Sequence, residues 1–210
     1  MTKVSEPMKL SHCRRRACSA STLDPEHGAS LITVLLILVI VSLIGVGSAQ
    51  IALMGERGSR SSRDIQVAWQ SAEAALIDAD IDLYNNVAST SRTRVFDGKT
   101  TSSFPSSGCG TSGDSKGLCA SVTSGKPNWL IVDFTGSTDV TTLGDYTGRS
   151  FSAGGTGTQP ALKPRYVIEP VLAQTGDKAS LEQEVVYRVT AMGFGPRTDI
   201  QAVLQMLYRN

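Results

Sequence analysis

The hydrophobic positions fall into three zones along the chain, and each zone has its own period. From Leu31 to Ala49 the sequence carries no charged residue and is dominated by Leu, Ile and Val. A helix needs about 20 apolar residues to cross a bilayer. The first zone therefore predicts a membrane-spanning helix.

The second zone is amphipathic. In RDIQVAWQSAEAALIDADIDLY, apolar residues recur at spacings of three and four, which predicts one apolar helix face. That face consists of Ile65, Ala68, Ala72, Ala75, Leu76, Ala79 and Leu83, and the opposite face is expected to carry most of Asp64, Glu73, Asp78, Asp80 and Asp82. No proline occurs between Pro25 and Pro105, so the two zones predict one helix from about Ala29 to Tyr84. Its glycines, at positions 45, 47, 55 and 58, predict either bends or close contacts with another helix.

The third zone alternates with the period of strands. PRYVIEPVLA, EQEVVYRVTAMGF and TDIQAVLQMLYRN read as three strands, with Gly193, Gly195 and Pro196 as the turn between the second and third. They predict an antiparallel meander whose apolar face needs one covering layer, which the amphipathic helix supplies. The fold class is thus α+β, a long N-terminal helix packed on a C-terminal antiparallel sheet.

Residues 87–160 separate the helix from the strands and are rich in Ser, Thr and Gly, with short apolar islands such as WLIVDF. Such a long irregular region is either a functional loop or is held by a disulfide and a few short strands. Cys109 and Cys119 lie in CGTSGDSKGLC and are well placed for that disulfide if this part is extracytoplasmic.

Charge adds a topology signal. The chain has 20 Lys and Arg against 19 Asp and Glu, a net charge of +1, so it shows no electrostatic sign of direct nucleic-acid binding. Residues 1–28 hold five of the basic and three of the acidic residues, which leaves 15 basic and 16 acidic ones in the rest. Because Arg14, Arg15 and Arg16 precede the apolar run, the C-terminal part is expected on the outer side of the membrane.

Catalytic chemistry is not indicated. Both histidines, His12 and His27, precede the apolar run, so a chain without residues 1–28 has no histidine for a catalytic triad or a metal site. Asp133, Asp139 and Asp145 are more typical of solvated loop carboxylates than of a calcium site. We expect a structural or interaction protein with no enzyme activity and no cofactor.

A basic leader ends in Gly28, an apolar run starts directly at Ala29, and a C-terminal sheet follows the helix. This arrangement resembles a type IV pilin precursor. The chain also contains HGASLITVLLILVIVSLIG, AWQSAEAALIDAD and YRVTAMGFGPRTDIQAVLQMLYR, with GLC and PRYVIEP as weaker signals. In these segments it resembles more specifically the PilX group of minor pilins. The resemblance implies that a prepilin peptidase cuts between Gly28 and Ala29 and that the new N-terminus is methylated.

The resemblance also assigns segments. Residues 1–28 are the removed leader, 29–54 the transmembrane half of the helix, 55–86 its amphipathic half, 87–160 a variable loop region and 161–210 the sheet. Two positions depart from major pilins: Ala29 stands where phenylalanine is usual, and Thr33 stands at mature position five, where glutamate is usual. That glutamate is thought to neutralise the amine of a neighbouring subunit in the apolar fibre core, where an unpaired charge is costly. Thr33 therefore favours a place at the fibre tip, where no subunit lies beyond.

The function that the resemblance implies is to start and cap type IV pilus assembly, which supports fibre biogenesis, twitching motility and adhesion. The expected partners are other minor pilins, the major pilin, a tip adhesin, the prepilin peptidase and the inner membrane. Before assembly the chain would cross the inner membrane once with its C-terminus in the periplasm, and afterwards it would lie in the fibre.

Three alternatives remain open at this stage. A pseudopilin of type II secretion shares the N-terminal pattern. An exported soluble protein would have its signal cleaved after Ala49, because Gly47, Ser48 and Ala49 are small residues. A plain single-pass membrane protein would keep its leader.

Overall fold

The computed structural model describes residues 29–84, 92–155, 157–175 and 182–209. The predicted leader, including Gly28, His12 and His27, lies outside these residues. By its internal contacts the chain divides into two units, Met1–Ala52 and Leu53–Asn210.

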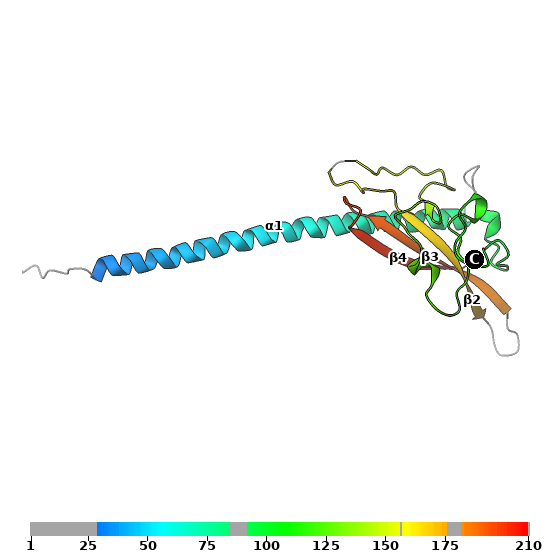
Figure 1. Ribbon diagram of the computed structural model, residues 1–210, viewed down its shortest axis with the longest axis horizontal. Helices are drawn as coiled ribbons and strands as arrows, with labels where there is room; N and C mark the ends of the chain where they lie inside the picture. The colour runs from blue at the N-terminus through cyan, green and yellow to red at the C-terminus, as the bar shows by residue number, and fades with distance from the viewer. Residues whose placement is uncertain (1–28, 85–91, 156, 176–181, 210) are drawn as a thin grey trace, which may run out of the picture. The chain divides into compact units, whose positions relative to one another are not determined.

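One helix, α1, runs from Ala29 to Tyr84 and confirms the single continuous helix expected from the two N-terminal zones (Figure 1). It continues through all four glycines without a change to another helix type. The first unit contains the uncharged part of α1, and residues 53–84 of the helix belong to the second unit.

The second unit contains the predicted antiparallel meander with one added strand. Its sheet has the order β1-β2-β3-β4, from Thr141–Thr142, Arg165–Thr175, Glu182–Phe194 and Gln201–Arg209. All neighbours are antiparallel, with Tyr166 opposite Ala191 and Ile168 opposite Val189. The short β1 pairs with the start of β2 and comes from the segment whose structure the sequence pattern left open.

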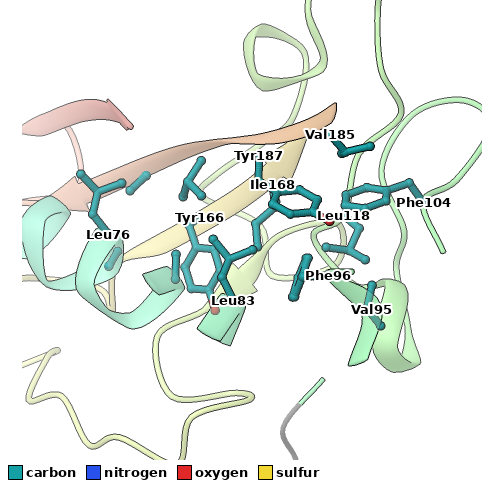
Figure 2. Packing of buried hydrophobic residues seen from close by; sticks show 14 residues of the cluster. Leu76, Leu83, Val95, Phe96, Phe104, Leu118, Tyr166, Ile168, Val185 and Tyr187 are labelled. Carbon is teal, nitrogen blue, oxygen red and sulfur yellow. The ribbon is translucent and has the colours of Figure 1, made fainter. Parts of the chain in front are cut away.

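The apolar face of α1 covers one face of this sheet, as expected. The residues of this core are Ala75, Leu76, Ala79, Leu83, Val95, Phe96, Phe104, Leu118, Tyr166, Ile168, Val185, Tyr187, Val189 and Ala191 (Figure 2). Ala68 and Ala72 are fully buried further along the same helix face. Ile65 was predicted on this face too, but it stays 53% exposed because its turn precedes Ala68, the first buried residue of α1.

Gly193 lies inside β3, where the sequence pattern placed it in the turn after that strand. A Cβ atom on Gly193 would lie 2.1 Å from the Ala68 carbonyl oxygen and 2.2 Å from the Ala72 nitrogen. The glycine is thus required by the close approach of α1 to the strand. The small side chains of Ala68 and Ala72 on α1 and the absence of a side chain at Gly193 on β3 together allow this close packing.

The sheet has two covered faces along β2, whereas the sequence predicted one covering layer. On the face away from α1, a second apolar cluster contains Cys119, Phe134, Val140, Val167 and Phe194, with Cys109, Trp129, Val132, Leu162 and Met192 packed around it. This layer comes mainly from residues 109–140. Val167 and Glu169, which alternate with Tyr166 and Ile168, are therefore buried as well.

Most of the region between α1 and β2 is irregular. The described part contains three short 3-10 helices, Thr93–Val95, Gly113–Ser115 and Asn128–Leu130, besides β1. The apolar island WLIVDF forms no strand: its first residues belong to the third 3-10 helix, and Phe134 fills the second cluster. The region is a folded layer rather than a loop without structure.

Candidate assembly surface

The uncharged part of α1 exposes its apolar side chains along the described residues of the first unit. The large residues from Leu31 to Met54 leave between 47% and 72% of their surface uncovered. Within the described residues this is the one helix long and apolar enough to cross a membrane. So large an apolar surface needs lipid or other protein around it.

The hydroxyl groups within this surface donate hydrogen bonds to backbone carbonyls of α1 itself. Thr33 Oγ1 donates to the Ser30 carbonyl at 2.9 Å, Ser42 Oγ to the Leu38 carbonyl at 2.7 Å, and a further serine follows the same pattern. A hydroxyl that donates to the preceding helix turn adds no unpaired polar group to an apolar environment. Thr33 is therefore compatible with lipid and with a fibre core, and it brings no charge.

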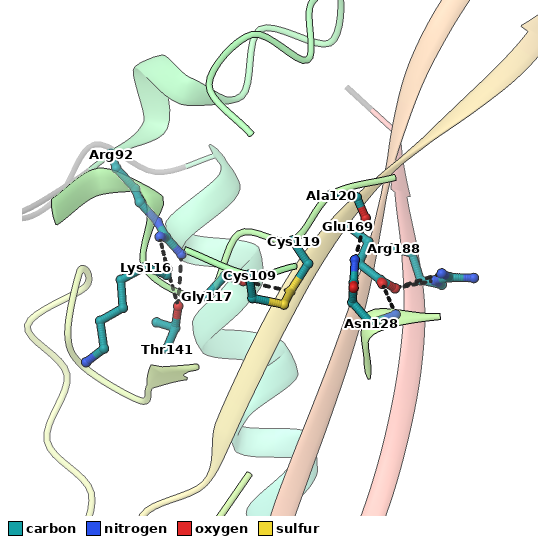
Figure 3. Close-up of a disulfide and its surroundings, with 10 residues drawn as sticks. All are labelled: Arg92, Cys109, Lys116, Gly117, Cys119, Ala120, Asn128, Thr141, Glu169 and Arg188. Atoms are coloured by element: carbon teal, nitrogen blue, oxygen red, sulfur yellow. Dashed lines mark hydrogen bonds and ion pairs between the residues drawn. A yellow bond between two sulfur atoms is a disulfide. The ribbon is translucent and has the colours of Figure 1, made fainter. Parts of the chain in front are cut away.

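The second unit contains the predicted disulfide between Cys109 and Cys119 (Figure 3). The backbone next to it joins the edge of β2: the Cys119 N–H donates to the Ile168 carbonyl at 2.8 Å, and the Ile168 N–H to the Gly117 carbonyl at 2.9 Å. The disulfide loop and β1 thus both pair with β2.

Gly117 in the GLC motif has a specific steric role. Its φ is +71°, a region that other residues rarely adopt, and a Cβ there would lie 2.2 Å from Thr141 Oγ1. The glycine lets the disulfide loop lie directly against β1. The short GLC motif thus has a structural role at the junction of the disulfide loop, β1 and β2.

Loss of the disulfide should weaken the layer that covers the outer face of β2. The bond closes a loop of sequence separation 10. We expect the double variant Cys109→Ser/Cys119→Ser to lose about 2–3 kcal/mol of unfolding free energy, by the chain-entropy estimate. Chemical unfolding of the full chain in detergent measures this. An unchanged midpoint would show that the layer is stable without the bond.

A buried ion pair connects α1 to this layer. Arg92 and Asp82 both have fully buried side chains, with Arg92 Nη2 2.7 Å from Asp82 Oδ2. Arg92 Nη1 donates to the carbonyls of Asp114 and Lys116, and Nη2 also donates to Thr141 Oγ1 (Figure 3). With its Nε–H on Asp82, all five guanidinium donors have acceptors.

The same carboxylate also reaches the sheet, because the Tyr166 hydroxyl donates to Asp82 Oδ2 at 3.0 Å. The Tyr146 ring lies 3.8 Å from the Arg92 guanidinium carbon, at cation–π distance. Burial by itself would lower the pKa of Arg92, but the charge and the hydrogen bonds of Asp82, together with smaller contributions from Tyr166 and Tyr146, outweigh burial and raise that pKa. One charged pair thus joins helix, sheet and disulfide loop.

Asp78 makes a second buried connection one turn earlier. Its oxygens accept from the Gly144 N–H and the Thr147 hydroxyl, and Arg149 Nη1 lies 3.6 Å away. The sequence pattern placed Asp78 and Asp82 on the solvent side of the helix. That prediction was wrong because the segment from Arg92 to Arg149 folds over this side and supplies the donors.

The pH dependence of stability should reveal Asp78. Burial raises its pKa above 3.8, against the opposing hydrogen bonds, so the folded state favours the neutral acid. Ionising Asp78 therefore costs more free energy in the folded state than in the unfolded state. This destabilisation is absent at a pH below the pKa that Asp78 has in the unfolded chain, and it grows as the pH rises above that pKa. Relative to wild type, Asp78→Asn should therefore gain in melting temperature between pH 3 and pH 7.

The variant Asp97→Asn is a control, because its stability relative to wild type should change with pH in the opposite direction. The Thr100 and Lys99 N–H groups lower the pKa of Asp97, so Asp97→Asn should lose relative stability as the pH rises. Parallel profiles for wild type and Asp78→Asn would contradict the role given to Asp78.

A third buried carboxylate, Glu169, lies on the outer face of the sheet. It accepts from the Asn128 N–H at 3.1 Å and from Arg188 Nη2 at 2.7 Å, and the Asn128 amide donates in turn to the Ala120 carbonyl (Figure 3). These bonds fix the third 3-10 helix on β2. Leu130, the last residue of that helix, and Ile131, which follows it, remain exposed.

Another part of the second unit is uncovered in the structure. On α1 the exposed residues Trp69, Ile77 and Tyr84 recur at spacings of seven and eight, outside the row of buried alanines. On β4 Met206 and Leu207 are exposed. A groove of about 460 Å³ lies between α1 and β4.

Among the described residues, no three His, Cys, Asp or Glu side chains group in a way that could hold a metal ion. Asp133 instead accepts from the N–H and hydroxyl of Thr135, and Asp145 pairs with Lys116 at 2.9 Å. These loop carboxylates are engaged in turns and surface pairs.

The structure places the predicted site residues in separate parts of the molecule. Ala29 begins α1 and Thr33 follows in the exposed apolar segment, whereas Cys109 and Cys119 lie in the second unit. Arg92, Asp82 and Asp78 were not singled out from sequence. Two aspartates at a spacing of four beside buried alanines are the signal that could have identified them.

Comparison with known proteins agrees with the features at both ends of the chain. A family model described as PilX N-terminal matches residues 27–76, and one described as type IV pilus assembly protein PilX C-term matches residues 115–210. No curated protein and no solved structure matches the chain significantly. The two models include α1 from its first residue, part of the disulfide loop and all four strands. The chain therefore belongs to the PilX family of type IV pilus assembly proteins.

Proposed function

We propose that this minor pilin starts and caps the type IV pilus at its tip. The observation that carries the proposal is the exposed apolar surface of α1 from Leu31 to Met54, in a chain of the PilX family. In the inner membrane, lipid covers this surface. In a fibre, the helices of neighbouring subunits cover it instead, so the chain exchanges one apolar environment for another.

Processing is the first step of the proposed pathway. The prepilin peptidase cleaves between Gly28 and Ala29, which leaves Ala29 as the methylated first residue. One finding supports this boundary over cleavage after Ala49: the N-terminal family model starts at residue 27 and continues through Ala49. The basic leader keeps the cleavage site on the cytoplasmic side, and the second unit folds in the periplasm, where the disulfide forms.

The place at the tip follows from Thr33. A fibre subunit with a neighbour beyond it meets that neighbour's N-terminal amine, which a carboxylate at mature position five can neutralise. Thr33 has only a hydroxyl there, and this hydroxyl donates within its own helix. Such a residue suits a subunit that meets no amine. Twitching motility and adhesion would depend on the protein through fibre initiation, and a tip adhesin would be one of its partners together with other minor pilins and the major pilin.

The variant Thr33→Glu tests the position in the fibre. At the tip the new carboxylate has no amine to pair with and lies in an apolar environment, so incorporation into sheared fibres should fall. Quantitative mass spectrometry of the fibres measures this, with Thr33→Val as the uncharged control. If the glutamate variant were incorporated better than wild type, the subunit would lie within the shaft.

Deletion and labelling test the wider function. A strain without this chain should form few fibres, and re-expression should restore them. Gold-labelled antibody against the second unit should mark one end of each fibre. Normal fibre numbers in the deletion strain, or label along the whole shaft, would contradict the proposal.

A further inference from the structure

We propose that the groove between α1 and β4 receives the α1 helix of a neighbouring pilin subunit, whose exposed arginine or lysine pairs with Glu73 and Asp80. This inference rests on the proposed function, because it names a contact within the fibre. The proposed function involves contacts between the uncharged parts of neighbouring α1 helices. The groove would be an additional contact site on the second unit.

The shape of the groove fits a helix. Its lining consists of Glu73, Leu76, Ile77, Asp80, Met206 and Tyr208. Four of these six residues belong to α1 and recur at spacings of three and four, the ridge pattern against which a second helix packs. Ile77 stands out from the surface and is 54% exposed.

The groove carries two carboxylates, Glu73 and Asp80. Neither Glu73 nor Asp80 forms an ion pair in the described part of the chain; the Trp69 indole N–H donates to one oxygen of Glu73 at 2.8 Å. Residues 85–91, which follow α1 directly, contain no basic residue. Two carboxylates beside an apolar floor therefore select a partner that brings positive charge together with apolar surface.

Asp80 also acts on Tyr208, which lines the same groove. Burial, and next the negative charge of Asp80, raises its pKa to about 12. Its hydroxyl stays protonated at physiological pH and donates to the Leu76 carbonyl at 3.1 Å. The floor of the groove is thus fixed, and the carboxylates at its rim are left to a partner.

This chain itself shows what a pilin helix offers. Arg57, Arg60 and Arg63 follow directly after its uncharged part. Arg60 pairs with Glu56, whereas Arg57 has no ion pair among the described residues. A parallel neighbour of the same design, displaced by roughly 25 Å along the helix axis at 1.5 Å per residue, brings its basic turn level with Glu73 and Asp80.

The sheet leaves this side open. The outer edge of β2 is paired with β1 and with the backbone around Gly117. In the described residues β4 pairs with β3 alone, and no strand covers its other edge. A long apolar edge strand is a liability unless a partner protects it. A helix seated in the groove covers Met206 and that edge together.

Photo-crosslinking in piliated cells tests the contact. The full chain carries p-benzoylphenylalanine in place of Ile77, and the adducts are identified by mass spectrometry of sheared fibres. We expect a peptide from α1 of a pilin, close to its first basic residues. A photo-crosslinker in place of Leu130, which is similarly exposed on another element, should not give this adduct.

The charges are tested in the same assay. The variant Glu73→Gln/Asp80→Asn keeps an acceptor for Trp69 and the shape of the groove. Its adduct yield should fall about ten-fold, which corresponds to ~1.4 kcal/mol. Asp139→Asn, which removes a carboxylate outside the groove, should leave the yield unchanged.

The outcomes separate this inference from the proposed function. If the chain is present in fibres but the crosslinker at position 77 reaches another element, another protein or nothing, the inference is wrong and the proposed function stands. An adduct that is insensitive to the loss of both charges would also overturn it. If the chain is absent from fibres, the proposed function itself fails.

Discussion

The Asp82→Ala variant is expected to lose about 3–5 kcal/mol of unfolding free energy, because it leaves the charge of Arg92 buried without its partner. The side chains of Arg92 and Asp82 are both fully buried, so bulk solvent does not reach the guanidinium in place of the carboxylate. Urea unfolding of the full chain in detergent measures the loss. Trp129, which packs on the second apolar cluster, reports on the layer by its fluorescence.

Two comparisons make this result specific. Asp114→Ala removes the partner of Arg94 in an exposed pair, with 74% and 45% of the two side chains open to solvent, and should cost less than about 1 kcal/mol. Asp82→Leu/Arg92→Met removes both charges and should recover part of the loss. If Asp82→Ala and Asp114→Ala cost the same, the buried pair is not what connects helix and layer.

Gly193→Val is expected to cost about 3 kcal/mol or more, the upper end of what overpacking a core costs. Valine is favoured in strands, so the loss cannot come from strand propensity. A Cβ at this position would meet backbone atoms of Ala68 and Ala72 at 2.1 and 2.2 Å. Backbone cannot rotate away as a side chain can, so α1 must move off the sheet.

Hydrogen exchange locates this effect. In Gly193→Val, the amides of α1 around Ala68 and Ala72 should exchange faster than in wild type. Gly58→Ala is the control, since nothing lies within 4 Å of a Cβ there and alanine favours a helix by about 1 kcal/mol. A stable Gly193→Val variant with unchanged exchange would mean that α1 does not pack this closely.

The regular elements of this protein follow from local patterns. The uncharged run and the alanine face predicted α1 as one continuous helix, because apolar positions with a helical period over many turns indicate a helix. The three C-terminal strands followed from alternation and from the turn residues between them. The disulfide followed from two cysteines in one loop.

The features that local patterns missed depend on contacts between distant segments. Asp78 and Asp82 look like solvent-side residues until the segment from Arg92 to Arg149 folds over them and supplies donors. Gly193 looks like part of a turn until α1 lies against it. Val167 and Glu169 look like the open face of a sheet until Phe134 and Asn128 cover it. In each case the partner lies at least ten residues away, beyond the range of any periodicity.

The mass of the mature N-terminus in purified fibres tests the central claim most directly, because it measures both processing and incorporation. Fibres sheared from wild-type cells, digested and sequenced by mass spectrometry, should contain a terminal peptide of this chain that begins with a methylated Ala29. A chain that begins at Gln50, one that keeps its leader, or fibres without this polypeptide would contradict the account.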